Sequence, residues 1–158
     1  MNRPRIYLET TLFNYYFDKA RDGHGATIQL FEAIGRGEYA GYTSEYVLFE
    51  LRNATEPKKN EMLSLIERYN ISVIDADDEA ARLAGVYVQN NVIPAQYRMD
   101  GVHIAIASIN ELDYILSFNF QHINKLKTKR MTELINLNEG YKGIIICTPM
   151  EVLEDEEY

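Results

Sequence analysis

Short apolar runs of strand length alternate along this chain with longer segments of helical spacing. "RIYL" at 5–8, "ISVID" at 71–75 and "GIIICT" at 143–148 are largely continuous apolar stretches and do not alternate between apolar and polar residues. Strands buried on both faces have this pattern, and strands separated by helices join in parallel. The pattern therefore predicts one α/β domain, a three-layer α/β/α sandwich with a mostly parallel central sheet.

The remaining elements follow from apolar periodicity and from the breaks between segments. Helices are expected over 25–36, from about 45, over 58–68, 77–90, 100–112 and 127–138, and further strands over 37–44 and 113–118. Pro57 separates the two helices near 45–68, which form a small helical excursion. The segment "DGVHIAIASINEL" is apolar around most of its circumference, so we expect a buried helix.

Length and composition limit the class of protein. The 158 residues suffice for one core, which we place at 1–153, with an acidic tail at 154–158. No stretch approaches the roughly 20 apolar residues that span a bilayer, so no membrane partner is expected. A single cysteine, Cys147, permits no internal disulfide and predicts a cytoplasmic location.

The charge balance narrows the kinds of partner. The net charge of −8 and the pI near 4.9 argue against broad, non-specific binding of nucleic acid through a positive surface. They do not exclude a nucleic-acid enzyme, because acidic residues that hold a metal contribute to the same negative sum.

Polar side chains follow two of the predicted strands at the edge where ligands bind in parallel sheets. Glu9 follows the first strand, and Ser117 and Asn119, in "ILSFNF", come at the end of the strand at 114–117. Asp100 opens the buried helix, and Glu50 lies within the helix that starts near 45. Oxygen-only groups of this kind suit Mg²⁺ or Mn²⁺, either of which can orient a water for attack on phosphorus.

Each of these residues also has a simpler interpretation. Glu9 could end a strand in solvent, Asp100 could cap its helix, and Asn119 is a common turn residue. Glu50 is harder to explain in this way, because Val47 and Ala54 surround it with apolar surface and an unpaired charge there is costly.

Other catalytic templates lack their defining residues. The sequence contains no GxGxxG, GxxxxGK[ST] or GxSxG motif, and its histidines lack zinc-ligand spacing. His103, one turn beyond Asp100, is more often a hydrogen-bonded core histidine than a ligand. A basic cluster is either a solvated helix start or a phosphate contact. Its members are Lys125, Lys127, Lys129 and Arg130.

Taken together, three segments resemble the PIN-domain ribonucleases, in particular the VapC-like toxins of bacterial toxin–antitoxin pairs. The segments are "IYLETTLFNYYF", "YTSEYVLFEL" and "YRMDGVHIAIASINELDYILSFNFQHI", and the closing "GYKGIIICTPMEVL" resembles the end of that domain. The resemblance covers about residues 5–153. Its most specific part is "DGVHIAIA…DYILSFNF", an acid that opens an apolar helix followed at a fixed interval by a polar strand end.

The resemblance implies a compact α/β/α fold and hydrolysis of RNA phosphodiesters by a metal-activated water, with Mg²⁺ or Mn²⁺ as cofactor. Carried over residue by residue, it implies that Glu9, Glu50 and Asp100 bind the metal. Asn119 completes the catalytic set, and Thr10 and Ser117 support it. The resemblance also implies an RNA substrate, a cognate antitoxin as partner and a homodimer in which the aromatic-rich region of Tyr15, Tyr16 and Phe17 makes contact. Lys125, Lys127 and Arg130 are candidates for substrate binding.

Two departures from the family pattern leave alternatives open. Glu9 stands where the family has Asp, and Asn119 stands where a fourth acid is common, although its amide oxygen can point at a metal-bound water. One alternative is therefore a degenerate PIN module that binds RNA or a protein without cutting. A second is an unrelated phosphotransfer or receiver-like domain, which would need an aspartate at a strand end where this chain has Glu9.

Overall fold

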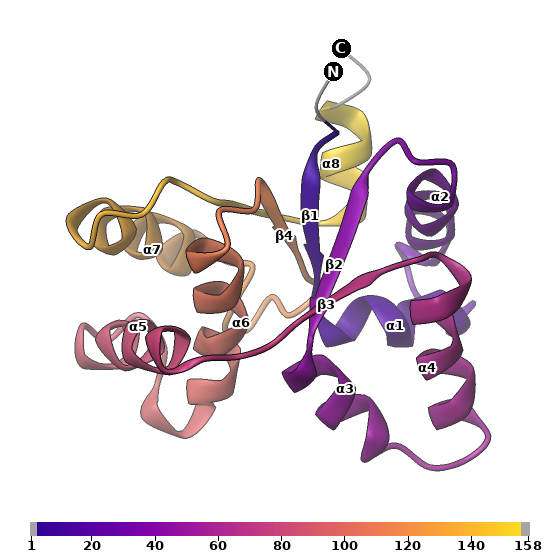
Figure 1. Cartoon of the computed structure of the whole chain (residues 1–158), viewed down its shortest axis with the longest axis horizontal. Helices are drawn as coiled ribbons and strands as arrows, with labels where there is room; N and C mark the ends of the chain where they lie inside the picture. Colours follow the sequence, from indigo (N-terminus) through magenta and orange to yellow (C-terminus); the bar gives the residue numbers. More distant parts are fainter. Residues whose placement is uncertain (1–2, 156–158) are drawn as a thin grey trace.

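The computed structural model describes residues 3–155, and this part of the chain forms a five-stranded sheet covered by helices on both faces (Figure 1). The elements in chain order are β1 (Arg5–Leu8), α1 (Thr10–Phe17), α2 (His24–Gly35), β2 (Ala40–Ser44), α3 (Glu45–Arg52), α4 (Lys58–Arg68), β3 (Ser72–Ile74), α5 (Asp78–Gln89), the 3₁₀ turn η1 (Ala95–Tyr97), α6 (Arg98–Ile109), β4 (Tyr114–Leu116), α7 (Leu126–Asn138), β5 (Ile145–Cys147) and α8 (Pro149–Asp155).

All strand pairs are parallel, in the order β3-β2-β1-β4-β5. The register pairs Tyr7 with Tyr42 on one side and with Ile115 on the other, so β1 is the central strand. The three-layer α/β/α sandwich with a parallel sheet predicted from the sequence is thereby confirmed.

The helices separate by face as the direction of the crossovers requires. The chain runs from β1 outward to β2 and β3, then returns past β1 to β4 and β5. Right-handed crossovers place helices from opposite directions of travel on opposite faces. In Figure 1, α5, α6 and α7 lie on one side of the sheet, and α1 to α4 lie on the other, where α8 packs against α2.

Burial explains why the central elements form. Ile6, Tyr7 and Leu8 of β1 and Ile115 and Leu116 of β4 have no exposed surface, as expected for strands covered on both faces. Every residue from Gly101 to Ser108 in α6 is buried, which confirms the buried helix predicted there.

The boundary of α6 differs from the expected one. The helix begins at Arg98 because the 3₁₀ turn η1 leads into it directly, so Asp100 is in its first turn and does not open it.

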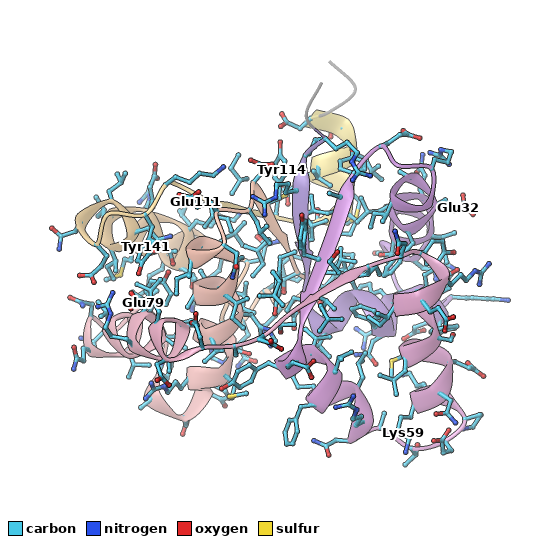
Figure 2. The ribbon with its side chains drawn as sticks, in the orientation of Figure 1. Glu32, Lys59, Glu79, Glu111, Tyr114 and Tyr141 are labelled. Atoms are coloured by element: carbon cyan, nitrogen blue, oxygen red, sulfur yellow. The ribbon has the colours of Figure 1, made fainter. Side chains whose placement is uncertain are left out.

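The outer helix α5 is tied to the chain just beyond α7 by polar contacts. Arg82 donates to Glu139 at 2.7 Å, and the Tyr141 hydroxyl donates to Glu79. Figure 2 shows Glu79 and Tyr141 near one another at the edge of this layer. At the other end of the chain, α8 continues through Glu154 and Asp155, the first residues of the expected acidic tail, and residues 156–158 lie outside the described part.

Candidate functional site

The candidate site lies at the carboxyl ends of β1 and β4, the two strands between which the strand order reverses. In open α/β sheets, ligands bind outside the carboxyl ends of strands at such a switch point. Glu9 directly follows β1, and Ser117 directly follows β4. Figure 1 shows α1 and α3 leaving the lower ends of β1 and β2, so these helices begin beside the same edge. The sequence analysis predicted that Glu9, Ser117 and Asn119 lie at this edge, and the structure places all three there.

Glu9 is buried and folds back to cap its own helix. Only 3% of its surface is exposed, so the interpretation as a solvated strand end is wrong. Its Oε1 accepts hydrogen bonds from the Thr11 hydroxyl at 2.6 Å, from the Ser117 hydroxyl at 2.7 Å and from the Thr11 backbone N–H at 3.3 Å. Glu9 is thus the N-cap of α1, and its carboxylate accepts from the backbone N–H of the second helical residue.

Thr11 is a site residue that the sequence analysis did not identify. Its hydroxyl donates to Glu9 and accepts from the Phe118 backbone N–H at 2.8 Å, so it joins the end of β1 to the end of β4. Thr10, the threonine expected to support the site, contacts Glu50 instead of Glu9. The only signal in the sequence is the pair of threonines after Glu9, and which hydroxyl turns toward which acid depends on the helical geometry of α1.

The pKa of Glu9 is raised above its ordinary value because burial removes the carboxylate from water. The charge of His103 and the hydrogen bonds from Thr11 and Ser117 oppose this effect without cancelling it. The fold therefore favours the protonated form of Glu9. The contribution of Glu9 to the free energy of unfolding is therefore fully present below the ordinary carboxyl pKa of about 4.3, where the side chain is protonated. This contribution is lost as the pH rises through the raised pKa of Glu9 in the folded protein.

Glu9→Gln should therefore stabilise the metal-free protein at pH 7.5, by about 0.5–2 kcal/mol, because the amide oxygen can accept the same hydrogen bonds without a buried charge. The gain should shrink as the pH is lowered to 4. Urea unfolding in EDTA at both pH values measures it. Glu67→Gln, at an exposed position of α4, is the control and should change little at either pH. A Glu9→Gln protein less stable than wild type at pH 7.5 would show that the charged form is the one the fold favours.

Glu50 is held by two donors from other parts of the chain. Its Oε1 accepts from His103 Nε2 at 2.6 Å and from the Thr10 hydroxyl at 3.0 Å. The side chain is 37% exposed, so one side of the carboxylate faces the site opening. Burial by itself would raise the pKa of Glu50, but the hydrogen bond and charge of His103 and the Thr10 hydroxyl bring the pKa below its ordinary value.

His103 is the residue around which the three carboxylates gather. It is 1% exposed, and both of its ring nitrogens are hydrogen-bonded, which agrees with its interpretation as a satisfied core histidine. Burial acts to lower its pKa, yet the hydrogen bond to Glu50 and the charges of Glu9, Glu50 and Asp100 raise it above the ordinary value. His103 is therefore a core histidine that also contacts the acids of the candidate site. Its position one turn after Asp100 is the feature of the sequence that could have indicated this.

Asp100 lies half-buried in the first turn of α6, facing the same site. The N-cap of α6 is Tyr97, so the capping interpretation of Asp100 is wrong. Burial raises the pKa of Asp100, an effect opposed by the charge of His103 and by a hydrogen bond from Asn119. The side chain is thus a partly desolvated carboxylate beside a histidine and a carboxamide, and it has no structural task in capping the helix.

Asn119 is positioned by the loop after β4. Its backbone N–H donates to the Ser117 hydroxyl at 2.9 Å, and its Oδ1 accepts from the His122 backbone N–H at 3.0 Å. We expected the amide oxygen to face a metal-bound water. That role stays a prediction, because the oxygen accepts from His122 and keeps a second lone pair, while the amide NH₂ donates to Asp100.

The three candidate basic residues lie at the start of α7, which returns from the site edge of the sheet. Lys125 is the N-cap position, and Lys125, Lys127 and Arg130 are all exposed. The structure brings together Glu9, Glu50, Asp100, Asn119, Thr10 and Ser117. It places the basic residues on exposed positions at the start of α7.

The donor set can be tested against the expected metal. Residues 3–155 contain no group of three or more Asp, Glu, His or Cys arranged to hold an ion. The described hydrogen bonds to Glu9 and Glu50 all end on Oε1, which leaves Oε2 of each as a free oxygen donor. Mg²⁺ prefers oxygen, is commonly bound through one or two carboxylates and keeps several waters. Glu9 and Glu50 therefore offer the one or two carboxylate oxygens that such an ion commonly uses, in an arrangement that leaves the remaining positions to water.

Comparisons with known proteins bear on the fold. No protein-family model matches the sequence, and no curated protein matches it. Solved structures similar to the chain include the following two. One is VapC20 of Mycobacterium tuberculosis, a sarcin–ricin loop cleaving toxin, with 12% identity and a TM-score of 0.55 over 74% of this chain and 92% of that one. The other is VapBC2 of Rickettsia felis bound to a DNA fragment from its promoter, with 14% identity and a TM-score of 0.59 over 90% of this chain and 98% of that one.

This likeness confirms the PIN-like fold expected from the resemblance to VapC-like proteins. None of the helices in the described part of the chain is long and apolar enough to cross a membrane.

Proposed function

We propose that this protein is a metal-dependent endoribonuclease that hydrolyses RNA phosphodiesters and is the toxin of a toxin–antitoxin pair. The observation that carries the proposal is the convergence of Glu9, Glu50 and Asp100, from three separate elements, around His103 at the switch point of the sheet. A like fold in a toxin that cleaves the sarcin–ricin loop supports the same class of reaction.

In this proposal Glu9, Glu50 and Asp100 hold Mg²⁺ or Mn²⁺. The bound ion would supply activation of a water and neutralisation of charge on the phosphate. The chain's own residues fix the carboxylates beforehand. Thr11 and Ser117 hold Glu9, Thr10 and His103 hold Glu50, and Asn119 donates to Asp100. Such fixed groups lower the reorganisation that the reaction requires.

The RNA itself would meet the basic start of α7. Lys125, Lys127 and Arg130 are exposed at the start of α7, the helix that follows the β4 end of the site, and Lys and Arg side chains commonly contact phosphates. They position the strand, while the carboxylates act at the scissile phosphate.

The partners and location belong to the same proposal. A cognate antitoxin is supported by the likeness to VapBC2, a toxin–antitoxin complex. We retain the homodimer and the cytoplasmic location as expectations of the proposal. Tyr16 is buried against Phe31 and Tyr69 in the monomer, so of the three aromatics expected at a dimer contact only Tyr15 and Phe17 retain partly exposed surface.

Calorimetric titration with Mn²⁺ and Mg²⁺ tests the proposal without knowledge of the RNA substrate. We expect saturable binding by the wild type and a loss of at least about 10-fold in metal affinity for Asp100→Ala. Removing a residue that only orients a metal ligand typically costs this much, and removing the ligand itself should cost no less. Asp78→Ala is the matched control, since Asp78 also lies in the first turn of a helix, α5, but is exposed. Absence of binding by the wild type would contradict the proposal and favour a module that binds RNA or protein without cutting.

A further inference from the structure

Tyr7 has a buried hydroxyl that lies between two groups connected to the site. It belongs to the central strand β1 and has no exposed surface. Its hydroxyl oxygen is 2.7 Å from Ser44 Oγ and 2.7 Å from His103 Nδ1. A phenol hydroxyl has one proton to donate and lone pairs to accept, so it can bond to both partners at once. Burial raises the pKa of Tyr7 well above its ordinary value, so the hydroxyl keeps its proton.

The first partner, Ser44, fixes the start of the helix that carries Glu50. Ser44 is the N-cap of α3, and its Oγ accepts from the Val47 backbone N–H at 3.3 Å. A cap hydrogen bond determines where a helix begins and in which direction the chain enters it. Tyr7 thus contacts the residue that sets the position of α3.

The second partner, His103, fixes the Glu50 carboxylate itself. A carboxylate only accepts hydrogen bonds, so His103 Nε2 must carry the proton that is donated to Glu50 Oε1 at 2.6 Å. The Tyr7 hydroxyl is hydrogen-bonded to Nδ1 of the same ring and to Ser44 Oγ, both at 2.7 Å, and its one proton serves one of these two bonds. One hydroxyl therefore sets both the helix that carries Glu50 and the ring orientation of the histidine that holds it.

We propose that Tyr7 is a positioning residue for Glu50, acting through the contacts Tyr7–His103–Glu50 and Tyr7–Ser44. This inference rests on the function proposed above. With Oε1 of Glu50 held by His103 and Thr10, the carboxylate has a fixed orientation, and its Oε2 accepts none of the described hydrogen bonds. Groups that orient a metal-binding carboxylate in this way typically change metal affinity by about 10–100-fold when removed.

Tyr7→Phe tests the proposal by removing a single oxygen atom, and Tyr87→Phe is its matched control. Tyr87 is equally buried, and its hydroxyl donates to Asn136 Oδ1 at 2.6 Å in the layer of α5 and α7. Tyr7→Phe loses the hydrogen bonds to Ser44 and His103, and Tyr87→Phe loses the one to Asn136, so both variants should lower the urea midpoint. Only Tyr7→Phe should weaken Mn²⁺ binding, by about 10–100-fold in calorimetry.

A second readout needs no metal. In the proton NMR spectrum of the metal-free wild type, the His103 Nε2–H should appear as a downfield, exchange-protected imidazole signal. Tyr7→Phe should shift or lose this signal, and Tyr87→Phe should leave it unchanged.

The two proposals can fail separately. A wild type that binds no Mn²⁺ overturns the proposed function, while an imidazole signal unchanged in Tyr7→Phe overturns the role of Tyr7. Equal Mn²⁺ affinities of Tyr7→Phe and Tyr87→Phe also overturn that role. Should Tyr7→Phe not fold, His103→Leu cuts the same connection, and Mn²⁺ affinity unchanged in that variant overturns the proposal.

Discussion

Asp100→Asn should lower the rate of metal-dependent RNA cleavage by at least about 10²-fold, the usual cost of removing one preorganised charged or polar group from an active site. The free energy of unfolding should stay within about 1 kcal/mol of the wild type, the size of a helix-dipole interaction. Asp100 is in the first turn of α6 without capping it, and burial raises its pKa, so the fold gains little from its charge. Single-turnover cleavage of a model RNA and urea unfolding measure the two quantities.

The isosteric amide makes this substitution informative. Asparagine keeps the volume of Asp100 and an oxygen that can accept from Asn119, so any loss of rate reports the missing charge. Wild-type cleavage rates in Asp100→Asn would remove Asp100 from the catalytic set. A large fall in stability together with the loss of cleavage would show a structural role instead.

Phe31→Ala should lower the free energy of unfolding by about 3–5 kcal/mol, the usual cost of truncating a buried phenylalanine. Phe31 of α2 has no exposed surface and contacts Phe13, Tyr16 and Tyr69, with ring centroids at 5.7, 5.1 and 5.3 Å. It is the common neighbour of aromatic side chains from α1 and from the end of α4. Because a domain of this size is stabilised by only about 5–15 kcal/mol, the loss is a large share of the total.

Urea unfolding monitored by circular dichroism measures this loss, with Phe49→Ala as the control. Phe49 in α3 is 60% exposed, so its truncation should change stability by no more than about 0.5 kcal/mol. Similar losses in the two variants would contradict the aromatic cluster as a centre of stability for this face of the sheet.

Local patterns in the sequence determined the order and type of most elements. The apolar runs at 5–8 and 113–118 become the central strands β1 and β4, and the segment apolar on all sides becomes the buried helix α6. These features are predictable because the spacing of apolar residues within a short segment indicates a strand or a helix. Parallel strands share their carboxyl edge, so the placement of Glu9, Ser117 and Asn119 at one rim also followed from the sequence.

Only the tertiary structure decided which side chains bond to one another at that rim. Glu50 is 53 residues from His103 and 40 from Thr10 in sequence, and no local pattern relates them. The same holds for Tyr7. The sequence indicates only that it is a core residue of a strand, whereas the structure places its hydroxyl between Ser44 and His103. Hydrogen bonds depend on distances of a few tenths of an ångström and on direction, and these are set by how α3 and α6 pack beside β1. The chain's local sequence therefore determined the framework and the acids at its edge, whereas packing between distant segments decided which oxygen of each acid is held by the protein and which is left for a ligand.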